Sequence, residues 1–162
     1  MLCPCGLEKS FKDCCNKIIN GEDKAHSPEQ LMRSRYAAYA TGNAKYIYHT
    51  YSKISQKPHS IGDIQQWAQQ TRWLKLVIHK VSPFKEKQNI EELAQVEFSA
   101  FYLHQGEINH MRECSNFVFE ENEWRYHDGE ISINDIVKKP KRNEACFCLS
   151  GKKFKQCCLS SF

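Results

Sequence analysis

The spacing of apolar residues predicts a helix that begins a short distance into the chain. Ser27, Pro28 and Gln30 form the pattern of an N-cap, a first helical position and a capping box. Gly42 is typical of the position just past the end of a helix. Between these signals the apolar residues recur at helical spacing, namely Met32, Tyr36, Tyr39 and Ala40. The sequence therefore predicts a first helix between Ser27 and Gly42.

Two further helices are predicted before the pattern changes. Asn43 is a candidate cap for a shorter helix that runs through Tyr48. Ser60 is a candidate cap for a third helix. The apolar face of that helix contains Ile61, Ile64, Trp67 and Ala68.

After Thr71 the apolar residues alternate with polar ones, which is typical of strands with one buried face. The alternating positions are Leu74, Leu76 and Ile78, then Ala94, Val96, Phe98, Ala100 and Tyr102. Residues 105–106 and 121–122 are predicted turns, and residues 108–120 a long strand between them. A last strand through Trp124 is predicted to end at 128–129. Helices followed by a meander of strands predict an α+β domain whose antiparallel sheet is covered on one face.

A short cysteine motif occurs twice, once near each end of the chain. Residues 3–15 read CPCGLEKSFKDCC and residues 146–158 read CFCLSGKKFKQCC, and they share seven of thirteen positions without a gap. Both have the frame C-x-C-x8-C-C. The eight cysteines concerned are Cys3, Cys5, Cys14, Cys15, Cys146, Cys148, Cys157 and Cys158. Chance does not readily produce the same frame twice, so we interpret these segments as two copies of one small module.

Composition favours a cytoplasmic protein in which these cysteines bind metal. Of the 162 residues, 41% are apolar and 26% charged, and no apolar run approaches the roughly 20 residues of a membrane span. The start Met1-Leu2-Cys3 has no signal-peptide pattern. In a reducing compartment, clustered cysteines are typical of metal ligands rather than of a disulfide framework. The ninth cysteine, Cys114, is predicted to be a small buried hydrophobe.

Four thiolates and no open position predict a closed, structural site for one zinc ion in each copy, two ions per chain. Iron is the main alternative metal, because tetrathiolate sites suit it as well. Disulfides or free thiols remain the simplest alternative to metal. The formal charge of +4 changes with metal, since each divalent tetrathiolate has a net charge of −2. The loaded protein is then near neutral, which weakens a nucleic-acid interpretation.

These motifs resemble a known family. The stretches CPCG from Cys3, LMRSRYAAY from Leu31, RNEACFCLSGKKFKQCC from Arg142 and ENEWRYHDG from Glu121 resemble the YchJ family of bacterial proteins that contain the SEC-C motif. The resemblance implies an NTF2-like cone of three helices on a curved antiparallel sheet, and metal binding by the eight cysteines. It implies a division into a knuckle (1–20), an NTF2-like domain (27–137) and a basic linker with a second knuckle (138–162).

Each copy departs from the usual motif C-P-C-G-S-G-K-K-[FY]-K-x-C-C. The first has Leu7 and Glu8 in place of Ser-Gly, and the second has Phe147 and Leu149 in place of Pro and Gly. Because glycine in such motifs serves turns with positive φ, we expect each copy to be strained at one place.

An NTF2-like cone often encloses a pocket. Residues that are candidates to line it are Tyr36, Tyr102, His110, Arg112 and Trp124. Strand alternation, however, places His110 and Arg112 on one face and Met111 and Glu113 on the other. No convergent acid–base constellation is evident, so we predict no catalytic residue. Arg33 and Arg35 in the first helix are expected to form ordinary ion pairs.

The leading hypothesis is a zinc-binding adapter that presents its knuckles to a macromolecular partner. Residues 138–155 contain seven Lys or Arg against one Glu, and Lys152, Lys153 and Lys155 are the candidate partner-binding residues. By resemblance, the partner belongs to the protein-export machinery or the ribosome, and a dimer is a further option. The alternative is an NTF2-like pocket protein or enzyme that acts on a small molecule, with purely structural knuckles. A metal-handling or redox role is the third hypothesis.

Overall fold

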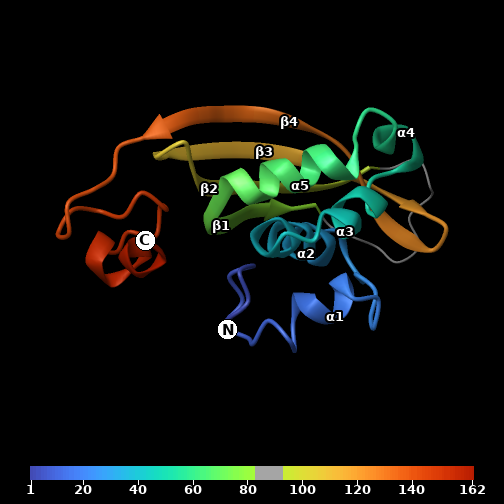
Figure 1. Ribbon diagram of the computed structural model, residues 1–162, viewed down its shortest axis with the longest axis horizontal. Helices are drawn as coiled ribbons and strands as arrows, with labels where there is room; N and C mark the ends of the chain where they lie inside the picture. The colour runs from blue at the N-terminus through green and yellow to red at the C-terminus, as the bar shows by residue number, and fades with distance from the viewer. Residues whose placement is uncertain (83–92) are drawn as a thin grey trace.

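The computed structural model describes residues 1–82 and 93–162. Four strands form one antiparallel sheet in the order β1-β2-β3-β4. Their bounds are β1 Thr71–Val81, β2 Ala94–His104, β3 Glu107–Glu120 and β4 Glu123–Val137. Figure 1 shows β3 and β4 arching over α2 and α5, with both chain ends below these two strands. The predicted α+β class and antiparallel meander are therefore confirmed.

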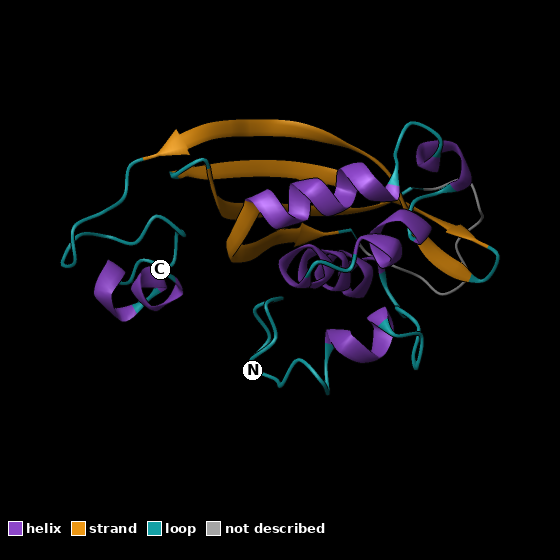
Figure 2. Ribbon diagram, in the orientation of Figure 1, coloured by secondary structure: helices purple, strands orange, loops and turns teal. Residues whose placement is uncertain are grey.

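The described residues contain five α-helices, four of them within residues 27–137, so the count of three expected for that domain is not confirmed. They are α1 Cys15–Ile19, α2 Pro28–Thr41, α3 Ala44–His49, α4 Lys53–Gln56 and α5 Ile61–Gln70. Two short 3-10 helices, η1 Phe154–Gln156 and η2 Cys158–Ser161, lie in the second cysteine motif. Figure 2 shows how small α1 and α4 are beside α2 and α5. Neither short helix has an apolar face several turns long, which is why the periodicity did not predict them.

The caps of the long helices follow from the sequence. The Ser27 hydroxyl accepts from the Gln30 amide N–H at 3.1 Å, and Gln30 accepts in return from the His26 N–H. Gly42 ends α2 with φ of +74°. Ser60 caps α5 through the Asp63 N–H. Asn43 precedes α3 as predicted, but its side chain donates to Thr41 instead of capping the helix.

The core lies between α2 and one face of the sheet, which we call the inner face. It contains Leu31, Met32 and Tyr36 of α2 and Val96, Phe98 and Ala100 of β2. The opposite, outer face has Ser99 and Phe101 on the same strand. Two-residue turns at 105–106 and 121–122, all four residues with positive φ, join β2 to β3 and β3 to β4. Positive φ at both turn residues gives the twist that hairpins favour.

The last strand does not end at 128–129, contrary to the prediction. Strand β4 continues to Val137, and Gly129 pairs with Ser115 inside the ladder. A side chain at position 129 would collide with Glu113, since a Cβ placed there lies 2.0 Å from Glu113 Oε1. The glycine therefore makes room for a neighbouring side chain and does not end the strand.

No helix among the described residues is long and apolar enough to cross a membrane.

Candidate functional sites

Each cysteine motif brings four sulfur atoms together. We call residues 3–15 the N-terminal knuckle and residues 146–158 the C-terminal knuckle. Within each knuckle all four sulfurs lie within 4.8 Å of one another. Neighbouring sulfurs are 3.7 Å apart for Cys5 and Cys14 and 3.4 Å apart for Cys148 and Cys157. A tetrahedron with a Zn–S distance of about 2.3 Å has edges of about 3.8 Å, whereas a disulfide needs about 2.05 Å.

The backbone produces the same arrangement in both knuckles. The Cys3 N–H donates to Lys9 O at 2.9 Å, and the equivalent Cys146 N–H donates to Lys152 O at 2.8 Å. Between the adjacent cysteines the chain is sharply bent, with φ and ψ of −123° and −117° at Cys14 and −135° and −105° at Cys157. The bend allows two consecutive side chains to face one point. The repeat in sequence is thus a repeat in structure.

The electrostatics of the thiols fit a bound cation. The hydrogen bond from Cys15 lowers the pKa of Cys5 to about 5, while desolvation raises the pKa of Cys14 to about 11. The hydrogen bond to Cys5 raises the pKa of Cys15, and burial raises the pKa of Cys158. Protons are thus shared unequally among thiols too close together to ionise all at once. A divalent ion supplies the charge that lets all four be thiolates.

The knuckles pack on different parts of the body. Cys3, Cys5 and Cys15 are buried against Ala37 of α2, with Phe11 half-buried beside them. Three cysteines of the C-terminal knuckle, Cys146, Cys148 and Cys158, are buried with Phe147 and Phe154 against Leu74, Phe101 and Ile108 on the outer face of the sheet. The sheet is therefore covered on part of its second face as well, which the sequence did not predict.

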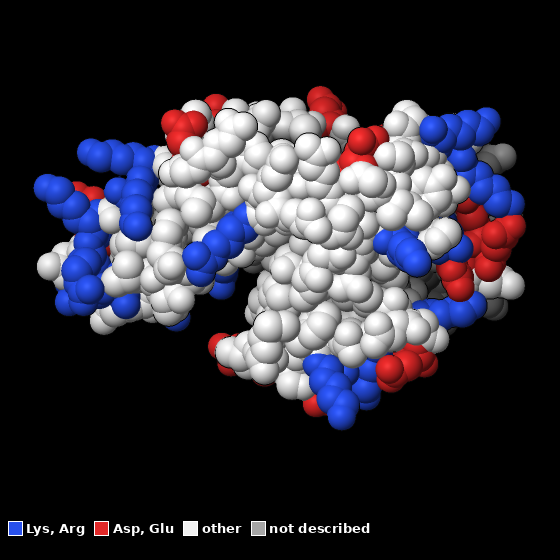
Figure 3. Space-filling model, viewed as in Figure 1, with Lys and Arg blue, Asp and Glu red and all other residues white. Residues whose placement is uncertain are grey.

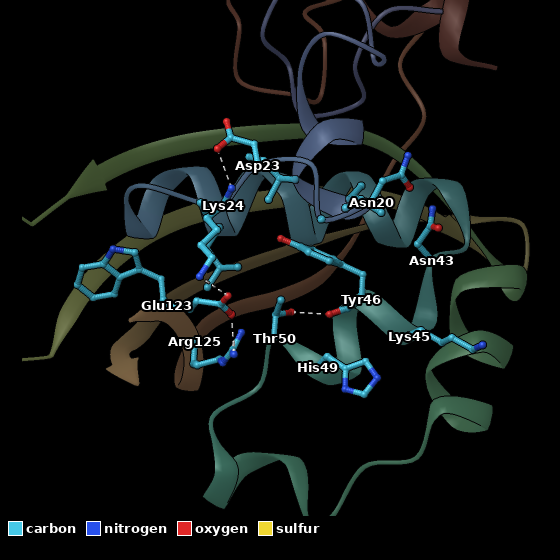
Figure 4. Close-up of a pocket in the computed structure, with 16 residues that line it drawn as sticks. Asn20, Asp23, Lys24, Asn43, Lys45, Tyr46, His49, Thr50, Glu123 and Arg125 are labelled. Carbon is cyan, nitrogen blue, oxygen red and sulfur yellow. Dashed lines mark hydrogen bonds and ion pairs between the residues drawn. The ribbon is translucent and has the colours of Figure 1, made fainter. Parts of the chain in front are cut away.

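Two of the hollows in the described part of the molecule are lined by helices and strands of the body. The larger, about 460 Å³, opens between the segment around α1 and residues of α3 and β4. Figure 4 shows Lys24 and Arg125 converging on Glu123 at its edge, at 3.0 and 2.7 Å. The two cations thus share one carboxylate, so the charged side chains at this edge are paired with one another.

The second hollow is a cavity of about 220 Å³ between α2 and the inner face of the sheet. Eight aromatic rings line it: Tyr36, Tyr39, Tyr51, Trp67, Trp73, Phe98, Tyr102 and Tyr126. Met32 and Met111 complete the apolar wall, and two charged side chains, Arg35 and Glu113, are also part of the lining. Desolvation raises the pKa of Tyr36, Tyr39 and Tyr126, so these hydroxyls stay protonated at neutral pH.

Comparison with known proteins decides the family. A family model described as YchJ, middle NTF2-like domain, matches residues 27–129, and the SEC-C motif matches residues 142–160. The chain belongs to the YchJ (UPF0225) family. A UPF0225 protein of Shewanella sp. (strain MR-4) is 38% identical over 161 residues, 97% of this chain and 95% of its own. A UPF0225 protein of Photorhabdus laumondii is 38% identical over 159 residues, 97% and 98% of the two chains.

Solved structures agree with this YchJ-family assignment. A SEC-C motif containing protein from Psychrobacter arcticus matches with a TM-score of 0.68 at 28% identity, over 98% of this chain and 95% of its own. One from Rhodopseudomonas palustris matches with a TM-score of 0.70 at 30% identity, over 80% of this chain and 98% of its own. The predicted family, its NTF2-like middle domain and its SEC-C motif are thereby confirmed.

The candidate pocket residues of this YchJ-family chain fall in three places. Tyr36 and Tyr102 line the aromatic cavity, whereas Trp124 lines the hollow of Figure 4. His110 and Arg112 are on the outer face, because side chains alternate along β3 and Glu113 is on the inner face. There His110 stacks on Phe101 and contacts the Ser99 hydroxyl at 2.8 Å. These two residues are therefore no part of the aromatic cavity.

Two other expectations need correction. Arg33 forms the expected ion pair, with Glu29 at 2.8 Å. For Arg35 the expectation is wrong, because no carboxylate of the described residues lies within 4.0 Å of its nitrogens. Its position three residues after Met32, on the apolar face of α2, was the signal that could have revealed a buried arginine. Cys114 is only partly buried, since it faces outward across from Glu97.

Proposed function

We propose that this YchJ-family protein is a zinc-dependent adapter, whose C-terminal knuckle binds an anionic surface of a macromolecule. The eight knuckle cysteines would hold two zinc ions. Four sulfur ligands leave no coordination position for water or substrate, which argues for a structural role of the metal. A redox-inert ion such as zinc suits that role. The body then serves as the fixed support on which a metal-folded surface is presented.

The observation that carries the proposal is the difference in charge between the two ends. Residues 138–155 contain seven Lys or Arg and one Glu, whereas residues 3–17 contain three Lys and two acidic residues. A divalent ion on four thiolates adds −2 to each site. The C-terminal region therefore stays strongly positive and the N-terminal knuckle does not. Figure 3 shows lysine and arginine side chains gathered over the C-terminal end of the molecule.

The lysines are placed to contact a partner. Lys152, Lys153 and Lys155 are all exposed, while the neighbouring Phe154 is 1% exposed and anchors the turn that carries them. None of the three forms an ion pair in the described part of the chain. Their charge is thus available to phosphates or carboxylates of another molecule. Binding of this kind weakens as salt rises.

Metal content is the first test of the zinc assignment. Protein purified anaerobically without chelator should contain two zinc ions per chain by mass spectrometry. Only Cys114 should then react readily with an alkylating reagent. Iron in place of zinc would reject the zinc assignment, and disulfides in freshly lysed cells would reject the metal sites altogether.

The adapter role is tested by charge removal on either knuckle. The triple change Lys152→Gln, Lys153→Gln and Lys155→Gln should abolish salt-sensitive co-sedimentation with purified bacterial ribosomes. The matched change Lys9→Gln, Lys12→Gln and Lys17→Gln removes the same charge from the N-terminal end and should have little effect. If binding survives nuclease treatment and requires only acidic export proteins, the partner is a protein and not the ribosome. Equal binding by both triple variants would refute the proposal.

A further inference from the structure

We propose that the aromatic cavity is a binding site for a small, neutral heteroaromatic molecule that has a hydrogen-bond donor next to an acceptor. Nucleobases are of this chemical class. The site is separate from both knuckles, and its function goes beyond the adapter role. The argument rests on two buried charges that face one cavity without pairing, and on the shape that surrounds them.

Arg35 and Glu113 are the two charges. They are 4% and 7% exposed, respectively. Arg35 donates to Ile47 O at 2.8 Å and to the Thr50 hydroxyl at 2.7 Å, both neutral acceptors. Glu113 Oε1 accepts from the hydroxyls of Ser115 and Tyr126, each at 2.7 Å. Neither charge has an ion-pair partner among the described residues.

Tyr126 connects the two groups. Its hydroxyl donates to Glu113, and the Arg35 guanidinium carbon lies 4.8 Å from the centre of its ring. Glu113 therefore lies at the hydroxyl of this ring and Arg35 over its face, and no ion pair joins the two charges. Burying two charges without a direct pair is costly. A molecule that donates to Glu113 and accepts from Arg35 would satisfy both groups.

The absence of a side chain at Gly129 leaves space for the Glu113 carboxylate. Gly129, inside strand β4, has no side chain at the place where the Glu113 carboxyl group lies. Glycine weakens a strand interior, because it loses more backbone entropy on folding than other residues and has no side chain to pack. Its presence here is explained by the need to hold Glu113 against the cavity, which favours a role for that carboxylate beyond packing.

The remaining features select the ligand class. An organic cation would find the ring faces of Tyr51 and Tyr126 already occupied by Arg35, at 4.3 and 4.8 Å. An anion that accepts from Arg35 would also be repelled by Glu113 in the same cavity. A cavity of about 150 Å³ accepts benzene, so about 220 Å³ admits one or two small rings. A flat neutral ring also stacks well on the aromatic walls.

Trp73 supplies a further indication. Its indole Nε1 is the one buried side-chain nitrogen or oxygen without a hydrogen-bond partner in residues 1–82 and 93–162. Its ring lines the cavity and packs against Tyr36, Tyr39 and Tyr102 at 5.2 to 5.3 Å between centroids. An unpaired buried donor is costly. A ligand acceptor within reach would recover part of that cost.

The test uses the intact protein with metal in its knuckles. Hypoxanthine and uracil are the probes, and indene is the control with a bicyclic outline but no polar groups. Binding is followed by tryptophan fluorescence, because two of the three tryptophans, Trp67 and Trp73, line the cavity. Calorimetry gives the affinities. We expect at least one polar probe to bind with a Kd below about 1 mM, and indene more weakly.

Three variants locate the binding. Glu113→Gln keeps the shape of the side chain and should weaken binding about tenfold or more, the effect of losing a hydrogen bond to a charged group. Gly129→Ala should weaken it as well, by displacing the carboxylate. Arg112→Gln changes an outer-face residue that pairs with Glu97 at 2.9 Å and should leave the affinity within about twofold.

The binding measurements can either support or overturn the proposed ligand site. Binding of either polar probe that depends on Glu113 and not on Arg112 supports the proposal. Failure of both probes to bind, or equal binding of indene with no effect of Glu113→Gln, overturns it. Thermal unfolding shows whether each variant is folded. Should Gly129→Ala unfold, the isosteric Glu113→Gln variant carries the test alone.

Discussion

The N-terminal knuckle rests on helix α2, whereas the C-terminal knuckle rests on the outer face of the sheet. Arg33 of α2 donates to Cys5 O at 2.7 Å and so fixes the first knuckle by a polar contact. The second is held by aromatic packing, with Phe147 5.4 Å from Phe101 of β2 between ring centroids. One metal-binding frame can therefore be attached to a body through two kinds of contact. At the first knuckle the contact uses the backbone of the ligand Cys5, and at the second it uses Phe147, which lies between two ligands.

The same comparison explains the departures from the usual motif. Phe147 occupies the place of Pro4 and is 7% exposed, because it packs against Phe101, Phe154 and Phe162. Leu149 occupies the place of Gly6, and both have positive φ, +64° and +85°. A change of residue type at the first position added packing. At the second position it added backbone strain.

Loss of a metal ligand should have the largest effect and should separate the knuckles. Cys15→Ser and Cys158→Ser each remove one of four ligands and should lower the metal content from two ions to one. The affected knuckle should then unfold, because a structural zinc contributes about 10 kcal/mol or more to the folding of its own module. The second variant should bind more of a hydrophobic dye. It uncovers Leu74, Phe101 and Ile108, which are at most 8% exposed, whereas the first uncovers mainly Ala37. Equal dye binding would contradict the difference in docking.

Aromatic packing at the second junction should come next in size. Phe147→Ala should lower the free energy of unfolding by about 3 kcal/mol, because it leaves a cavity among buried rings. Its counterpart Pro4→Ala should change stability by less than about 1 kcal/mol, since Pro4 is only half-buried. Denaturant unfolding of both metal-loaded variants measures the difference. Similar losses would mean that the sheet does not support the C-terminal knuckle.

The sequence predicted those features that depend on local pattern. Ser27 and Ser60 begin α2 and α5 as their N-cap positions indicate, and the turns at 105–106 and 121–122 join the strands. The family and its NTF2-like domain also followed from motifs in the chain. Such signals act over a few residues, and they need no knowledge of what packs against them.

Features that depend on contacts between distant segments were not predictable. Gly129 was interpreted as the end of a strand, because the reason for a glycine there is Glu113 on the neighbouring strand. Arg35 was expected to form an ion pair. Its place on the apolar face of α2 indicates burial, but only the tertiary structure shows that it faces a cavity. The packing of Phe147 on Phe101 joins residues 46 positions apart. In each case the decisive neighbour comes from another element.

Removal of the polar contact at the first junction should have a moderate effect. Arg33→Met keeps much of the side-chain volume but leaves Cys5 O without its donor, at a cost of about 1–2 kcal/mol. The N-terminal metal should then be lost faster to a chelator, while the C-terminal metal is unaffected. Arg72→Met is the matched control, because Arg72 donates to Phe162 O at 3.2 Å in an exposed contact beside the other knuckle. Faster loss from both sites would show that the two knuckles are coupled through the body.

Backbone strain should give the smallest effect, with opposite signs at the two ends. Leu149→Gly should stabilise the C-terminal knuckle by up to about 1 kcal/mol, because a side chain in the left-handed region costs about that much. Little burial is lost, since Leu149 is 62% exposed. Gly6→Ala should destabilise the N-terminal knuckle, although a Cβ there has space, 3.7 Å from Leu76 O. Chelator competition should show slower metal loss in the first variant and faster loss in the second. The same direction in both would mean that φ at this position does not control metal retention, and that the aromatic contacts of Phe147 compensate for the strain at Leu149.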